Sequence, residues 1–157
     1  MSAMQRTPLK RKRTAGKRRT ASACKVLRCK RRIATAELCR THAVARCDVL
    51  ARAICRALYG RCARCGETDS LQWSHHLSRR YMNVRWQLAN AVMHCVKCHT
   101  YLTYHPEEHA AWSEEYVGRD QWERLRTLAF GSDVKFTTTD LAEWLLLLEA
   151  TAPTEKG

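Results

Sequence analysis

Residues 62–66 read Cys-Ala-Arg-Cys-Gly, and residues 95–99 read Cys-Val-Lys-Cys-His. Zinc binds four soft ligands in a tetrahedron, and two Cys-x-x-Cys pairs supply four thiolates with little backbone strain. The 29 residues between the two pairs exceed the spacing of ordinary zinc fingers, so we expect this insert to be structured itself. The pattern predicts one structural zinc ion bound by Cys62, Cys65, Cys95 and Cys98.

The insert predicts two short strands joined by a long loop. Leu71 and Trp73 alternate with polar residues, which is the spacing of a strand that leads to His75. A second strand is expected at 91–94, and a helix follows it to about residue 104. The loop at 77–88 is basic and aromatic. The order strand, loop, strand, helix predicts a small zinc-stabilised α+β unit.

Helices are expected on both sides of this unit. Apolar residues, among them Val49 and Leu58, recur at close to helical spacing from 43 to 59, and Gly60 is a suitable C-cap. Pro106 opens a further helix at its favoured first position, and this helix ends near Gly118. Two more helices are predicted, one at about 120–130 and one at 140–150 with Thr139 as its N-cap.

The net charge of +13 is concentrated at the N-terminus. Residues 1–32 contain thirteen Lys and Arg and no acidic residue, whereas the remaining 125 residues contain fifteen basic and fifteen acidic side chains. Such a segment suits a nucleic acid, because each phosphate that it neutralises releases condensed counterions. Since residues 1–23 also lack apolar periodicity, we expect a disordered basic arm there.

Cysteine usage and hydropathy indicate the compartment. The longest apolar run has five residues, so no membrane span and no membrane partner are expected. No apolar segment of the signal-peptide type follows the basic residues, and nine cysteines is an odd number for a disulfide scaffold. We therefore expect a reducing, cytoplasmic location.

A second zinc site is predicted upstream. Three cysteines and a histidine with intervals of four, nine and two residues supply three thiolates and an imidazole, namely Cys24, Cys29, Cys39 and His42. Cys47 and Cys55 are then left over. They lie eight positions apart on the predicted helix, and we interpret them as small apolar core residues.

Three polar residues flank the predicted strands and helix. His75 ends the first strand, Asn90 precedes the second, and His99 follows the second cysteine pair directly. A histidine on a strand can act as general base on water, and a histidine on the facing helix can bind a divalent metal. Such a metal stabilises the charge on the leaving oxygen of a phosphodiester.

The segment from Cys62 to about Leu125 resembles HNH endonucleases, specifically the phage-encoded type with zinc knuckles, and is also similar to NinG-type phage recombination proteins. The resemblance rests on the order Cys-x-x-Cys-Gly, Leu71-Gln-Trp-Ser-His75, Arg79-Arg-Tyr81, Arg85-Trp86, Asn90 and Cys95-x-x-Cys-His99. It implies a ββα-metal (HNH, His-Me finger) fold and metal-dependent cleavage of DNA.

The resemblance also implies roles for individual residues. His75 is the general base, Asn90 orients the loop, and His99 binds a catalytic Mg²⁺, Mn²⁺, Ni²⁺ or Zn²⁺ ion. The implied partners are DNA and phage packaging or recombination proteins, and the implied location is the cytoplasm of an infected or lysogenic host cell.

One position departs from the family pattern. Ser74 stands where many HNH enzymes have a metal ligand, so water and substrate, or a side chain such as His105, must complete the metal shell. A second register stays open, in which His75 is the ligand and His76 the base, and His76 is also kept as an alternative metal ligand. We prefer the first register, because Leu71 and Trp73 then pack on one strand face.

Ser74 also keeps two other functions open. One is a zinc-dependent DNA-binding or packaging accessory protein with a degenerate active site, and the other is a junction-specific recombination nuclease. Basic residues near the insert are predicted to contact phosphates or to form a solvated face: Arg79, Arg80, Arg85 and Lys97.

The chain is thus divided into four segments. The basic arm spans 1–23, a small zinc knuckle with a helix spans 24–60, the HNH nuclease module spans 61–118, and a C-terminal helical extension spans 119–157. Trp86 of the loop is expected to close the small core.

Overall fold

The computed structural model describes residues 23–131 and 135–153. Apart from Ala23, the predicted basic arm lies outside the described residues. Within them the chain forms five α-helices and a two-stranded antiparallel sheet, so the predicted α+β class is confirmed. In chain order the elements are α1 (Arg40–Tyr59), β1 (Leu71–His75), the 3-10 turn η1 (Leu88–Asn90), β2 (Ala91–Cys95), α2 (Val96–Tyr104), α3 (Pro106–Val117), α4 (Arg119–Phe130) and α5 (Thr138–Thr151).

The two strands form a hairpin whose register aligns the second cysteine pair with the start of β1. Leu71 lies opposite Cys95, and His75 lies opposite Ala91. β2 passes directly into α2, and the Cys95 sulfur caps this helix by accepting a hydrogen bond from the Cys98 amide. The same knuckle therefore ends a strand and begins a helix.

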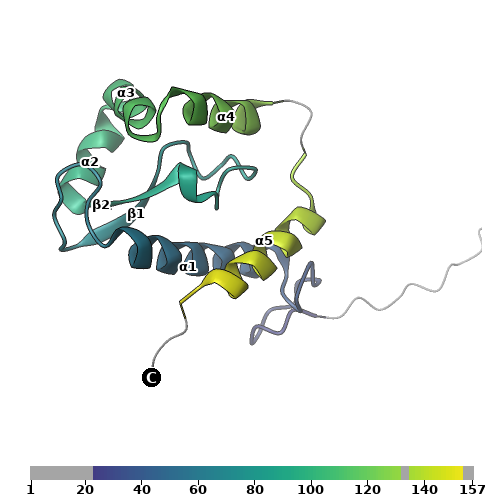
Figure 1. Cartoon of the computed structure of the whole chain (residues 1–157). Helices are drawn as coiled ribbons and strands as arrows, with labels where there is room; N and C mark the ends of the chain where they lie inside the picture. Colours follow the sequence, from purple (N-terminus) through teal and green to yellow (C-terminus); the bar gives the residue numbers. More distant parts are fainter. Residues whose placement is uncertain (1–22, 132–134, 154–157) are drawn as a thin grey trace, which may run out of the picture.

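The hairpin lies between α1 on one side and α2, α3 and α4 on the other (Figure 1). Successive side chains of a strand point to opposite faces. Trp73 and Met93 point toward α1 and belong to the main core, where both are almost fully buried. On the other face, the His94 ring lies 4.9 Å from the Trp112 ring of α3.

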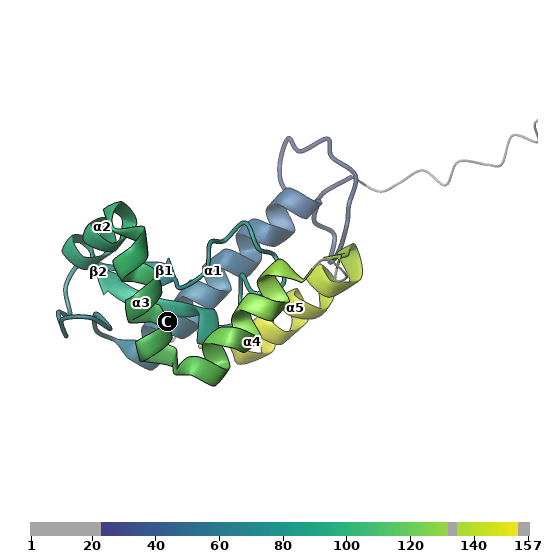
Figure 2. The same cartoon turned by 90° about the horizontal axis from the view of Figure 1, so that it is seen from above.

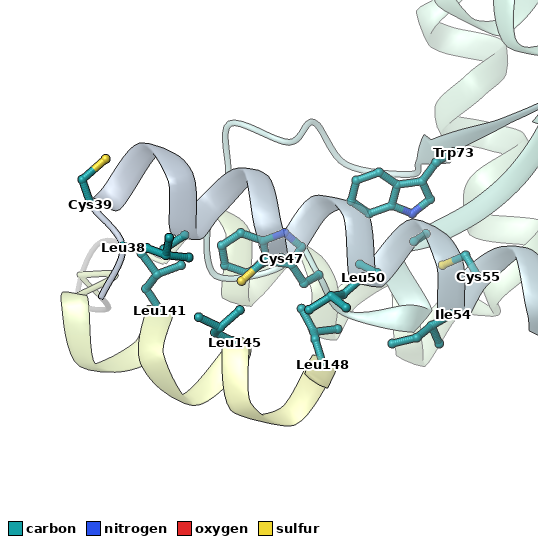
Figure 3. Packing of buried hydrophobic residues seen from close by; sticks show 14 of the residues in the cluster. Leu38, Cys39, Cys47, Leu50, Ile54, Cys55, Trp73, Leu141, Leu145 and Leu148 are labelled. Atoms are coloured by element: carbon teal, nitrogen blue, oxygen red, sulfur yellow. The ribbon is translucent and has the colours of Figure 1, made fainter. Parts of the chain in front are cut away.

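The main core is built between α1, the hairpin and α5. The two helices α1 and α5 run side by side in both views (Figures 1 and 2). Three leucines of α5 point toward α1 and are at most 3% exposed: Leu141, Leu145 and Leu148 (Figure 3). Burial of each such side chain contributes roughly 1.5–3 kcal/mol. The predicted C-terminal extension thus packs on the helix of the second predicted segment.

The predicted helix at 43–59 is confirmed, but not all of its apolar residues are buried. Val49 and Leu58 are 55% and 60% exposed. Cys47 and Cys55 instead are fully buried within the main core, which confirms them as small apolar residues (Figure 3). Their thiols are narrow enough to let α5 and the hairpin approach the helix closely.

The helix ends follow local capping chemistry. Gly60 ends α1 in the left-handed region at φ 56°, as expected for a C-cap glycine. The N-cap of α5 is Thr137, and the prediction of Thr139 was wrong. Thr137 Oγ1 accepts from the Asp140 amide, and Asp140 accepts from the Thr137 amide at 2.6 Å. This reciprocal capping box requires an acidic residue three positions after the cap, which Thr139 lacks.

A smaller core fixes the loop between the strands. Trp122 and Leu125 of α4 pack on Leu77 and Val84 of the loop, and all four are buried. α4 therefore holds the loop against the hairpin from the side that faces away from α1.

Candidate functional site

The four cysteines of the two pairs converge on one point. Their sulfur atoms all lie within 4.8 Å of one another, and the sulfurs of Cys65 and Cys95 are 3.7 Å apart. A tetrahedron with Zn–S bonds of about 2.3 Å places its sulfurs about 3.8 Å apart. A disulfide requires about 2 Å. The cluster of Cys62, Cys65, Cys95 and Cys98 can therefore bind a structural metal ion such as zinc.

The upstream residues form a second cluster of the same kind. The sulfurs of Cys29 and Cys39 are 3.9 Å apart, and Nδ1 of His42 lies 3.2 Å from the Cys24 sulfur. All four ligand atoms lie within 4.8 Å of one another. This cluster can also hold a structural metal ion, which would link the segment before α1 to the first turn of that helix.

The cysteines of the first cluster differ in how readily they lose their protons. Burial raises the pKa of Cys62, but backbone amides of Cys95, Cys65 and Arg64 outweigh it and lower this pKa to about 7. Burial and the neighbouring thiols raise the pKa of Cys98 to about 12. Since a metal-binding cysteine is a thiolate, metal binding here releases protons and depends on pH.

A cleft of about 480 Å³ opens where β1 ends beside α2 and α3. It brings together four histidines, two serines and one arginine from three elements and the loop: His75, His76, His99, His109, Ser74, Ser78 and Arg79. No carboxylate of the described residues lines it. The predicted base and the predicted metal ligand thus line the same cavity.

His75 is held in one tautomer. Its Nε2 lies 3.0 Å from the backbone carbonyl oxygen of Arg85. A carbonyl only accepts, so Nε2 carries the proton and Nδ1 keeps its lone pair. Burial, aided by the charges of Arg79 and Arg85 and opposed by the carbonyl bond, lowers the pKa of His75 to about 4. The ring is therefore neutral at pH 7, with its lone pair on Nδ1.

His99 lines the cleft and is also held in one tautomer. Its Nδ1 lies 2.5 Å from the side-chain oxygen of Gln72, which accepts a hydrogen bond. The proton is therefore on Nδ1, and Nε2 has a lone pair. Metal-binding histidines commonly have this arrangement, in which the far ring nitrogen donates to an acceptor. Burial lowers the pKa of His99, which favours the neutral form that a metal requires.

His76 faces the opposite side of the hairpin from the main core. Its Nδ1 lies 2.9 Å from the hydroxyl oxygen of Ser113 in α3, and the side chain is 6% exposed. No described residue hydrogen-bonds to its Nε2, nor to Nε2 of His109. Burial, with the charges of neighbouring histidines, lowers the pKa of His76 to about 3. The chemistry of the two rings is therefore compatible with either His75 or His76 as the base. Of the two, only His75 bonds to a backbone carbonyl that orients its ring.

Asn90 ties the two ends of the loop together. Its side chain is fully buried, and its Oδ1 accepts from the Leu77 amide at 2.8 Å. Its Nδ2 donates to the carbonyl oxygens of Leu77 at 3.1 Å and Val84 at 3.0 Å. Leu77 follows His76 in the chain. Asn90 thus orients the loop backbone next to the cleft, as a loop-ordering residue must.

The four predicted phosphate contacts lie in different places. Arg79 lines the cleft, whereas Lys97 lines a separate groove beside the cysteine cluster. Arg80 lies over the Tyr81 ring, with its Cζ atom 4.7 Å from the ring centre. Arg85 is paired with Asp48 inside the protein. Of the four, Arg79 alone lines the histidine cleft.

Two residues of the site have no strong signal in the sequence. Arg52 of α1 lines a groove of about 290 Å³ together with Arg79 and His99, so this groove continues the cleft. His109 lines the cleft itself. His105 does not; its Nδ1 bonds to the Tyr101 carbonyl and its ring stacks on Tyr101. The two histidines are only four residues apart, about one helical turn, so the sequence does not distinguish them. The packing of α3 places His109, and not His105, in the lining of the cleft.

Comparisons with protein-family models, curated proteins and solved structures found no match to this chain. None of the helices in residues 23–131 and 135–153 is long and apolar enough to cross a membrane.

Proposed function

We propose that this protein is a metal-dependent endonuclease that hydrolyses DNA phosphodiester bonds in the histidine cleft. The observation that carries the proposal is the meeting, in one cavity, of a neutral His75 with a free Nδ1, of His99 with a free Nε2, and of Arg79. A base, a metal ligand and a cation are the groups that phosphodiester hydrolysis requires. The resemblance of residues 62–125 to HNH endonucleases supports the same reaction.

The residues divide the chemistry between them. Nδ1 of His75 takes a proton from the water that attacks phosphorus, while its Nε2 stays bonded to the Arg85 carbonyl. The Arg79 guanidinium offsets the charge of the phosphate oxygens. His99 would hold a divalent cation through Nε2, and such a cation would stabilise charge on the leaving oxygen. The unpartnered nitrogens of His76 and His109 fit a cavity that receives a cation or water.

The cysteine cluster has a structural role in this proposal. Cys95 ends β2, which pairs with the strand of His75, and Cys98 lies in the first turn of α2, next to His99. A metal ion that joins these cysteines to the knuckle at residues 62–65 holds the strand and the helix at a constant separation. The distance between base and metal ligand then depends on the structural ion.

DNA binding follows from the charges near the cleft. Arg52 and Arg79 line one groove together with His99, and both arginines are exposed. Guanidinium groups pair well with phosphate oxygens. The thirteen basic residues of 1–32 add a sequence-independent attraction to the duplex.

Nicking of supercoiled plasmid in Mg²⁺, Mn²⁺ or Ni²⁺ tests the proposal. We expect cleavage by the wild-type protein, and a loss of about 10²–10⁴-fold in His75→Ala, which removes the base. His99→Ala should lose activity in a way that higher metal concentration partly restores. His105→Ala is the matched control, because this exposed histidine lies outside the cleft. Absence of metal-dependent nicking by the wild type would refute the proposal.

One observation favours a second candidate function. Ser74 lines the cleft at the position of an HNH metal ligand, and no carboxylate of the described residues replaces it. A DNA-binding or packaging accessory protein without catalytic activity would have such a site. It predicts a gel shift with duplex DNA and no nicking under any of the metal conditions.

Branched substrates in the same assay test the recombination nuclease, which cleaves junctions in preference to linear duplex.

A further inference from the structure

We infer that Asp48 of α1 is a positioning residue for His75 and acts through Arg85. The inference rests on the proposed function for its catalytic consequence, but its structural core is independent of catalysis. Asp48 lies outside the HNH-like segment, and it is the sole acidic residue among the 20 residues of α1.

The first link is a two-pronged ion pair. Arg85 Nε donates to Asp48 Oδ1 at 2.9 Å, and Arg85 Nη2 donates to Asp48 Oδ2 at 2.6 Å. Both side chains are only 17% exposed, so solvent screens this pair little. Parallel bonds of this type fix the orientation of the guanidinium as well as its position.

Asp48 also gathers other parts of the loop. Trp86 Nε1 donates to Asp48 Oδ1 at 2.8 Å, and the Trp86 ring is buried in the main core. Arg85 Nη1 donates to the carbonyl oxygen of Arg79 at 3.0 Å. One carboxylate of α1 therefore holds three positions of the loop that lines the cleft. Although burial raises the pKa of Asp48, the hydrogen bonds from Arg85 and Trp86 outweigh it and keep this pKa below its usual range.

The last link reaches the ring of the base. The backbone carbonyl oxygen of Arg85 lies 3.0 Å from His75 Nε2. The side chain and the carbonyl belong to the same residue, so holding the guanidinium against α1 limits where the carbonyl points. Asp48 thereby keeps the His75 proton on Nε2 and the lone pair on Nδ1.

An ordinary surface ion pair does not explain this arrangement. The pair of Arg46 and Glu149 also joins α1 to another element, but its atoms are 3.7 Å apart and its side chains are 51% and 44% exposed. Neither Arg46 nor Glu149 lines the cleft. Glu149→Gln therefore provides a matched control, since it removes the same charge from an ion pair of the same helix.

The tautomer of His75 is the direct readout. Ring ¹⁵N chemical shifts in the zinc-loaded full-length protein without DNA report which nitrogen carries the proton. We expect the Nε2–H form in the wild type and in Glu149→Gln, and a mixture with at least 10% of the Nδ1–H form in Asp48→Asn. Folded Asp48→Asn with an unchanged His75 tautomer overturns the inference. Asp48→Glu keeps the charge but displaces it, so it should give a smaller fraction of the Nδ1–H form than Asp48→Asn. It replaces Asp48→Asn in this test if that variant does not fold.

Kinetics measure the catalytic consequence. With saturating DNA and metal, Asp48→Asn should lower the single-turnover cleavage rate about 10-fold or more and leave the half-saturating DNA concentration unchanged. In an Arg85→Ala background, Asp48→Asn should lower the cleavage rate little further, because the link from Asp48 to His75 through Arg85 is already lost. If the double variant instead loses the product of the two single rate reductions, Asp48 does not act through Arg85. If the wild type does not cleave DNA, the proposed function fails, while the tautomer measurement still decides the inference.

Discussion

The cysteine cluster beside α2 and the histidine cleft at the end of β1 are neighbours that differ in how they are assembled. In the cluster all four sulfurs lie within 4.8 Å of one another. In the cleft the histidines come from β1, the residue after it, α2 and α3, and their nitrogens do not form such a group in the described residues. The cluster therefore surrounds one point on all sides, whereas the histidines of the cleft line an open cavity.

This difference corresponds to two kinds of metal chemistry. A structural ion is fully surrounded by protein ligands, whereas a catalytic ion keeps positions for water and substrate. The cluster offers four thiolates and leaves no position open. The cleft offers imidazoles with free lone pairs and unpartnered nitrogens at His76 and His109, which leaves room for a substrate. Substitutions should therefore affect folding in the first region and chemistry in the second.

Loss of a cluster ligand should have the largest effect. Cys62→Ser removes one of four thiolates, and structural zinc ions contribute about 10–16 kcal/mol of apparent binding free energy in finger peptides. A domain is stable by only about 5–15 kcal/mol. We expect the protein to lose one zinc ion and its cooperative thermal transition, measured by metal analysis and circular dichroism. Cys47→Ala, which changes a buried cysteine outside both clusters, should keep both ions.

Loss of His99, the proposed metal ligand in the cleft, should leave the fold intact. We expect His99→Ala to retain its structural zinc and its melting transition but to bind Mn²⁺ at least about 10-fold more weakly, since even residues that support ligands are worth 10–100-fold. Electron paramagnetic resonance of free Mn²⁺ measures this binding without DNA. Equal Mn²⁺ affinity in His99→Ala and His105→Ala would remove His99 from the metal site.

Acidification should destabilise the protein through its buried histidines. Burial is the first cause in each case, and it lowers the pKa to about 4 in His75, about 3 in His76 and about 4 in His94. The unfolded chain binds protons at its histidines below about pH 6.5, while the folded chain does not until pH 3–4. Stability is therefore complete above pH 6.5 and declines as the pH falls toward these lower values.

The urea midpoint should fall between pH 6.5 and 5, over the range in which a chelating dye detects no zinc release. His76→Asn should reduce the slope, because it removes one of the three groups. A midpoint that does not change with pH in this range would contradict the neutral, buried state of these rings.

The smallest effect is expected at the edge of the cleft. Arg52→Ala should weaken binding to duplex DNA by a few fold and reduce the salt slope by about one, as loss of a single phosphate contact does. Arg124→Ala is the control, because Arg124 of α4 lines neither the cleft nor its continuing groove. Equal effects of both substitutions in a fluorescence anisotropy titration would show that Arg52 is not part of a local contact.

Local pattern was a good guide to the hairpin and to the ligands. Leu71 and Trp73 alternate with polar residues, and the strand begins and ends where this alternation predicts. Local spacing does not define the buried face of α1, because its partner α5 lies about 80 residues further along the chain. Val49 fits a helical apolar pattern but is 55% exposed, whereas Cys47 is buried because α5 covers it.

The cysteine clusters were determined by the sequence itself. Two residues between cysteines in a tight turn bring their sulfurs to zinc-binding distance, and the knuckle then starts α2 with His99 in its first turns. The tertiary structure alone decided which side chains hold the ring of His75. Asp48 and Arg85 are 37 residues apart, and no local spacing relates them. They meet because burial of Trp73 and Trp86 against α1 brings the loop onto this helix, and the contact sets the carbonyl that orients His75.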